Sequence, residues 1–223
     1  KSLLGNLVFV DPKNNEYVQR DIYLSGNVVE KLRIAQDAAE RDSSFRSNVF
    51  HLEEVRPAPI AFHEISLRLG AHWIPVEEVH AFVENLFNKE IQPAEFSITR
   101  NETTGEWSVD VHTRFRSDHS AQFSLDYGTE SCLFNNLLEM TLNGKMPTHR
   151  YPKVKGERGT PPIDTERTME SRAKQEQIQQ RFLAWITNSD ERVERFENLY
   201  NNTVNVIALP EVSGDHITFD GLN

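Results

Sequence analysis

A chain of 223 residues with a formal net charge of −10 can bury a hydrophobic core, but its surface cannot be basic throughout. It lacks an apolar run of the roughly 20 residues that cross a bilayer, an initiator methionine and a signal-peptide pattern, so we expect a cytoplasmic segment of a longer protein. The single cysteine, Cys132, excludes an internal disulfide and a zinc site built from several cysteines, and its apolar neighbours predict a core thiol.

The N-terminal residues predict a hairpin followed by two helices. Residues 7–18 place turn formers between two short apolar runs, which is typical of a β-hairpin. Apolar residues at helical spacing then predict helices over 27–41 and 45–55, and Pro57 prevents continuation of the second. The two helices are expected to form a helical hairpin.

The stretch YLSGNVVEKL at residues 23–32 has two interpretations. A phosphate-binding loop needs several glycines and a lysine at the helix start, whereas this stretch has one glycine and its Lys31 lies a turn too late. We therefore predict that Ser25 or Asn27 caps the helix, with anion binding as the alternative.

The next residues predict helix and then strand. Pro75 suits the first position of a helix whose apolar face continues to Leu86. The alternating residues 63–70 allow a strand, but we expect a short helix closed by Gly70. Residues 96–100 and 106–115 follow the period of a strand and predict a second hairpin.

A third strand is expected over 121–125, followed by a helix that Thr129 caps and that ends at Asn143-Gly144. The proline-rich residues 145–162 predict a loop. Beyond it we predict a long helix over 165–187, another helix capped by Ser189, and an extended tail.

These elements together predict an α+β fold that is mainly helical. Three parts are expected: residues 1–90, with a hairpin and helices; residues 91–144, with a small antiparallel hairpin and a helix; and residues 145–223, with a basic linker and the C-terminal helices.

Positive charge gathers in one window of this acidic chain. Residues 150–181 contain eight lysines and arginines but only five acidic residues. A glycine- and proline-containing loop with basic side chains can follow a phosphate backbone without reading base edges. The predicted nucleic-acid contacts are Arg150, Lys153, Lys155, Arg158, Arg172 and Lys174, and the alternative is a solvated linker. Tyr151 could stack on a base, although we expect it to anchor the loop.

No stretch predicts catalysis. The histidines do not converge at the spacing of metal ligands, and the carboxylate pairs Glu53-Glu54 and Glu77-Glu78 diverge by about 100° on a helix. Ser131 beside Cys132 has no base at a recognisable motif spacing. We therefore predict no catalytic residue, no metal and no cofactor in this segment.

Six stretches carry a resemblance to a known family. They resemble the region that joins the two catalytic halves of very large phage and plasmid proteins, in which an adenine-specific DNA methylase precedes a superfamily 2, Swi/Snf-like helicase. The stretches are IYLSGNVVEKL (22–32), SNVFHLEEVRP (47–57), ISLRLGAHWIP (65–75), YGTESCLFNNLLEMTLNG (127–144), AKQEQIQQRFLAWI (173–186) and GDHITFDGLN (214–223).

The resemblance implies a parent enzyme linked to antirestriction and mobile-element maintenance. ATP and S-adenosylmethionine would bind only its flanking modules, in the cytoplasm of a bacterial host or packaged in a virion. The first hypothesis for this segment is a noncatalytic connector that handles DNA. The second is a scaffold that docks the methylase and helicase modules without touching DNA. A third, mimicry of DNA by the acidic surface, is disfavoured because the carboxylates are scattered among cations.

Overall fold

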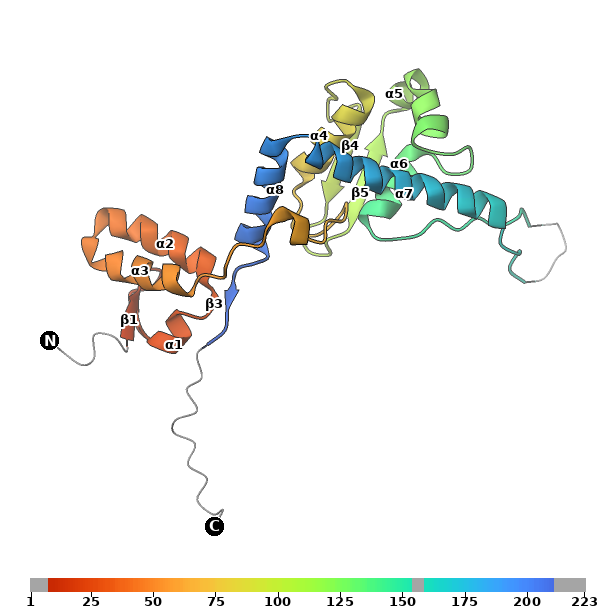
Figure 1. Cartoon of the computed structure of the whole chain (residues 1–223). Helices are drawn as coiled ribbons and strands as arrows, with labels where there is room; N and C mark the ends of the chain where they lie inside the picture. Colours follow the sequence, from red (N-terminus) through yellow and green to blue (C-terminus); the bar gives the residue numbers. More distant parts are fainter. Residues whose placement is uncertain (1–7, 154–158, 211–223) are drawn as a thin grey trace, which may run out of the picture. The chain divides into compact units, whose positions relative to one another are not determined.

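The computed structural model describes residues 8–153 and 159–210 and has a mainly helical α+β fold (Figure 1). The chain forms two compact units. Unit 1 combines residues 1–65 with residues 197–223, and unit 2 comprises residues 66–196. Unit 2 is therefore inserted, in sequence, between the two parts of unit 1.

Unit 1 begins with the predicted hairpin, followed by the predicted helices. A turn in which Asn15 adopts a left-handed φ of 60° joins the two strands, and the amide of Asn15 donates to Asp11 O at 2.7 Å. The described elements of this part are β1 (Val8–Asp11), β2 (Glu16–Gln19), α1 (Arg20–Tyr23), β3 (Gly26–Asn27), α2 (Val28–Arg41), α3 (Arg46–Val55) and 3-10 turns at Ser43–Phe45 and Phe62–Glu64.

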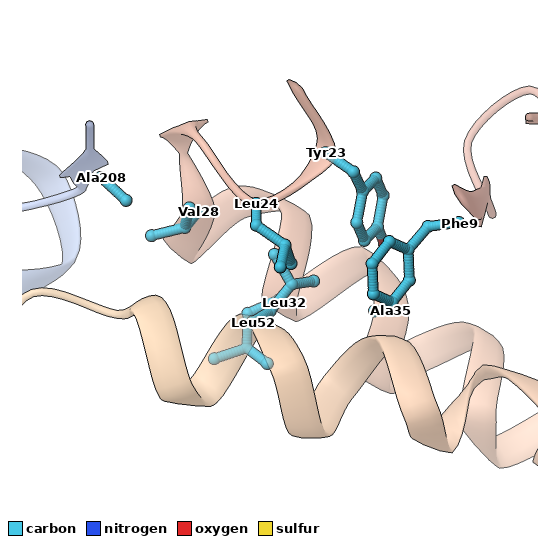
Figure 2. Close-up of a cluster of buried hydrophobic side chains, with 8 residues drawn as sticks. All are labelled: Phe9, Tyr23, Leu24, Val28, Leu32, Ala35, Leu52 and Ala208. Carbon is cyan, nitrogen blue, oxygen red and sulfur yellow. The ribbon is translucent and has the colours of Figure 1, made fainter. Parts of the chain in front are cut away.

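The core of unit 1 lies between the hairpin, α1 and the two helices (Figure 2). The rings of Phe9 and Tyr23 stack with their centroids 5.1 Å apart. Asn48 is buried beside them, and its amide donates to the Tyr23 hydroxyl at 3.0 Å and to Val10 O at 2.8 Å. A buried amide costs stability unless it is hydrogen-bonded, so these two bonds make Asn48 compatible with the core.

The C-terminal part of the chain completes unit 1. Strand β6 (Ile207–Ala208) pairs antiparallel with β3, and Asn201 donates to and accepts from the backbone of Ile60 at 2.9 and 2.8 Å. Helix α8 (Asp190–Thr203) follows the Ser189 cap, as predicted, and the boundary between the units falls within it.

Unit 2 consists of a β-hairpin and the helices around it. Helix α6 packs against β5 and against the long helix α7 (Figure 1). Asn143 extends the hairpin's edge, since it accepts from the amide of Trp107 at 2.9 Å and donates to its carbonyl at 2.8 Å. The elements are α4 (Val76–Phe87), β4 (Phe96–Arg100), β5 (Trp107–Val111), α5 (Thr113–Asp118), a π-helical turn (Gln122–Asp126), α6 (Phe134–Leu142) and α7 (Thr165–Thr187).

Aromatic side chains fill unit 2. Phe87 lies at the centre of one cluster, with ring centroids 5.5 to 6.4 Å from those of Phe96, Phe115, His119, Phe123, Tyr127 and Phe134. A second cluster joins Phe82 to Phe182 and Trp185, and Phe196 to Trp73. The prediction that Trp73 and Trp185 are core residues is confirmed.

Four local predictions are wrong. Residues 63–70 form a 3-10 turn only as far as Glu64 and then an irregular segment. Strand β5 ends at Val111 because His112 caps α5, its Nδ1 accepting from the amide of Arg114 at 3.3 Å. The segment 121–125 is part of a π-helical turn rather than a strand, and its Phe123 enters the Phe87 cluster.

The fourth difference concerns Thr129, which does not cap a helix. Its hydroxyl accepts from the amide of Cys132 at 2.9 Å and closes a turn, and α6 begins only at Phe134. The helix ends at Asn143-Gly144 as predicted, where Gly144 has a φ of 65°.

Candidate functional site

The structure places the start of the basic window in a loop tied to the beginning of α7. Arg150 forms an isolated bridge with Ile163, and its Nη1 donates to Pro161 O at 2.7 Å. Lys153 is exposed, and Lys155 and Arg158 lie outside the described residues. The Tyr151 side chain is 51% exposed, so the expectation that it anchors the loop is wrong.

The other two predicted contacts lie on α7, where they hold neighbouring segments. Arg172 donates from Nε to Pro147 O at 3.2 Å. Lys174 donates to Leu125 O at 2.6 Å and to Asp126 O at 3.2 Å, at the end of the π-helical turn. Carbonyl groups at the end of a helical turn lack hydrogen-bond partners within that turn. Lys174 supplies such a partner, and this structural role competes with binding an anion.

A buried polar network fixes the base of the basic loop. Asp164 caps α7 by accepting from the amide of Arg167 at 3.2 Å, and its own amide donates to His149 O at 2.9 Å. His149 Nε2 lies 2.8 Å from the Ser171 hydroxyl, which in turn lies 3.2 Å from the hydroxyl of Thr129. The Ser171 side chain is fully buried. This serine-histidine pair therefore joins segments of the fold and does not present a nucleophile to substrate.

Beside this loop, a groove of about 580 Å³ lies between α7 and the segment after α6. Exposed methionines and cations line it: Arg68, Lys145, Met146, Met169 and Arg172, together with Glu176. Of these, the sequence predicted only Arg172 as a site residue. Positions 169, 172, 173 and 176 follow helical spacing and therefore lie on one exposed face of α7. This spacing could have identified the α7 wall of the groove from the sequence, but nothing in the sequence indicates that Arg68 and Lys145 lie beside it.

A larger polar cleft of about 1140 Å³ lies beside the hairpin. Arg100 there donates to His72 O at 2.7 Å, and its guanidinium lies over the Trp107 ring at 5.0 Å. Lys145, which lines both cavities, pairs with Glu106 at 2.9 Å. Arg100, Lys145 and Glu106 thus make contacts within the fold itself.

The stretch at residues 23–32 is confirmed as a helix-capping sequence. Asn27 Oδ1 accepts from the amide of Glu30 at 3.0 Å, whereas the Ser25 hydroxyl donates to Ile22 O. The Lys31 ammonium donates to the carbonyls of Ile22, Tyr23 and Ser25 at 3.0, 2.9 and 2.7 Å. Desolvation lowers the pKa of Lys31, against the charge of Asp11, which raises it. The Lys31 ammonium is therefore occupied by backbone oxygens of residues 22–25.

Cys132 is a buried thiol, as predicted, and burial raises its pKa. Thiolates, not thiols, are the reactive species, so this site disfavours nucleophilic chemistry. Over residues 8–153 and 159–210, no three or more His, Cys, Asp or Glu side chains are grouped so that they could hold a metal ion. The described helices also include none that combines the length and apolar character needed to cross a membrane.

A family model described as a domain of unknown function (DUF8437) matches residues 68–206, which span most of unit 2 and continue into the C-terminal part of unit 1. No curated protein matches the sequence. No solved structure matches it either. The family match covers the groove, α7 and the basic window together.

Proposed function

The chain belongs to the family described as a domain of unknown function (DUF8437), and we propose from its own residues that it is a noncatalytic connector that docks neighbouring protein modules. The six stretches that resemble the methylase-helicase proteins support a setting between the two catalytic modules of a phage or plasmid protein. In that setting the catalytic residues, ATP and S-adenosylmethionine belong to the flanking modules.

The observation that carries this proposal is the way in which the basic side chains are used. Arg150 and Lys174 each donate to backbone carbonyls of the chain's own fold. An overall charge of −10 further opposes approach to DNA, which is itself an anion. Protein docking needs neither free cations in a row nor a basic surface.

We expect the full chain to bind the isolated methylase or helicase segment of its parent protein. Modules joined in one chain meet at an effective concentration of about 1 mM, so a dissociation constant of about 100 μM already holds them together. Isothermal titration of the chain with each segment, at low and moderate salt, measures this. Titration with ATP and with S-adenosylmethionine gives no heat if the segment is noncatalytic. Absence of binding to both segments would contradict the docking role.

DNA handling is the second candidate function, and a specific observation favours it. Arg150, Tyr151 and Lys153 lie close together in sequence on an exposed loop, and an exposed aromatic ring between cations can stack on bases while its neighbours contact phosphates. Such a contact would tolerate any sequence.

If the loop contacts DNA, changing Arg150, Lys153, Lys155 and Arg158 together to alanine weakens binding and lowers the salt dependence. The log-log slope against salt is expected to fall by about 0.9 for each phosphate that the variant no longer neutralises. Fluorescence anisotropy of labelled duplex and single-stranded DNA measures both quantities. The matched control changes four exposed cations of unit 1 to alanine: Lys13, Arg33, Arg41 and Arg46. Equal binding by the two variants, or no binding by the wild type, removes the DNA contact.

A further inference from the structure

We propose that the groove between α7 and the segment after α6 binds an acidic peptide segment that carries apolar side chains and belongs to a docked module. This inference rests on the proposed docking function and assigns it a site. The groove is defined by Arg68, Lys145, Met146, Met169, Arg172 and Glu176, and all of these residues belong to unit 2.

The groove is preformed, because hydrogen bonds join α7 to the neighbouring segments. Gln175 donates to Lys145 O at 2.8 Å, and Arg172 donates to Pro147 O at 3.2 Å. Farther along α7, Gln179 accepts from the amide of Leu69 at 3.0 Å. These bonds hold both walls to one rigid helix. A preformed site loses less conformational entropy on binding than a flexible one.

The charge of the groove selects an anionic partner. The groove has one carboxylate, that of Glu176, and Lys145 at its edge pairs with Glu106. Arg68 and Arg172 have no ion pair among the described residues. The Arg68 guanidinium lies over Gly144, where an added Cβ would come within 3.1 Å of its Nη1. Arg172 uses Nε for Pro147, and its two Nη atoms have no hydrogen bond among the described residues. Each guanidinium can thus offer paired donors to a carboxylate.

The methionines decide between an acidic peptide and a nucleic-acid backbone. Met146 is 63% exposed and Met169 is 65% exposed. Methionine is flexible and polarisable, and it adapts to varied apolar partners. A sugar-phosphate backbone offers little apolar surface to cover these side chains. A peptide that alternates carboxylates with apolar side chains matches both features.

The test uses the full chain and a labelled amphipathic peptide of leucines and glutamates. Comparison probes are a serine-glutamate peptide, a leucine-lysine peptide and duplex DNA. Two single variants, Arg68→Glu and Met169→Ser, alter exposed groove side chains. Their controls are Arg46→Glu, with the same change of charge on unit 1, and Leu125→Ser, which removes an apolar side chain that is 62% exposed elsewhere on unit 2. Circular dichroism and tryptophan fluorescence verify that each variant is folded.

The wild type is expected to prefer the leucine-glutamate peptide, and each groove variant is expected to bind it about tenfold more weakly, the scale expected when an interface anchor is removed. Controls should stay within about twofold of the wild type. Equal binding by groove variants and wild type, indifference to the leucines, or no binding of the peptide overturns the proposal. Binding of duplex DNA that depends on Arg68 and excludes the peptide overturns it in favour of a nucleic-acid site. If the peptide fails but a flanking segment still binds, docking stands and only this groove is wrong; if both fail, both proposals fall.

Discussion

Replacing Gly70 with alanine is expected to destabilise unit 2 by about 2 to 5 kcal/mol. Gly70 has a φ of +89°, and a Cβ added there would lie 2.2 Å from Leu142 O and 2.5 Å from Leu142 Cα. A left-handed non-glycine residue costs about 1–2 kcal/mol, and overpacking against atoms that cannot move away costs about 1–3 kcal/mol more. Since Leu142 ends α6, relief of the clash would require this helix end to shift.

Gly105 provides the matched control for this prediction. It has a φ of +71° in the same unit, but an added Cβ would meet nothing within 4 Å, so Gly105→Ala should cost only the backbone strain. Urea unfolding followed by tryptophan fluorescence measures both variants. The signal is specific because all three tryptophans, Trp73, Trp107 and Trp185, lie in unit 2. Equal destabilisation by the two substitutions would contradict the proposed clash.

Replacing Phe87 with alanine is expected to cost about 3 to 5 kcal/mol, the range for removing a buried aromatic ring. The ring lies among Phe96, Phe115, Phe123 and Phe134, all of them buried, so the cavity cannot fill with water at low cost. A domain is stable by only about 5–15 kcal/mol. This single change therefore removes a large share of the stability of unit 2.

Two further variants separate the ring from general apolar burial. Phe87→Leu keeps an apolar side chain of similar size and should cost about 1.5 kcal/mol. Leu125→Ala changes a side chain that is 62% exposed and should cost less than about 0.5 kcal/mol. Thermal unfolding by circular dichroism, together with the aromatic signal in the near ultraviolet, ranks the three variants. A loss as small for Phe87→Ala as for Leu125→Ala would show that the cluster is not a stabilising core.

The predictions that succeeded rest on local patterns. Helices α2, α3 and α7 follow the spacing of their apolar residues, and caps such as Asn27 lie within three residues of their partners. Periodicity predicts the wrong element where contacts between residues distant in sequence determine the backbone conformation. The strand period of β5 predicted a strand that continues through Phe115, but Phe115 lies in helix α5 and its ring packs in the Phe87 cluster. Local sequence contains no information about that cluster.

At the candidate site, too, local sequence predicted some features, and contacts between distant residues determined the others. Counting charges along the sequence identified Arg172 and Lys174. It could not identify their carbonyl partners Pro147 and Leu125, which lie 25 and 49 residues away in the sequence. The groove likewise combines Arg68 with residues of α7 that are far from it in sequence. Sequence therefore identifies which side chains carry charge, whereas the fold determines which of them keep it available to a partner.

The pairing of β3 with β6 has a mechanical consequence. Residues 26–27 and 207–208 are hydrogen-bonded neighbours, and both ends of the inserted segment 66–196 return to unit 1. Tension applied across residues 8 and 210 is therefore carried first by the contacts of unit 1, among them the β3–β6 pair. As long as those contacts hold, the pull does not reach unit 2, so α7 and its groove stay folded.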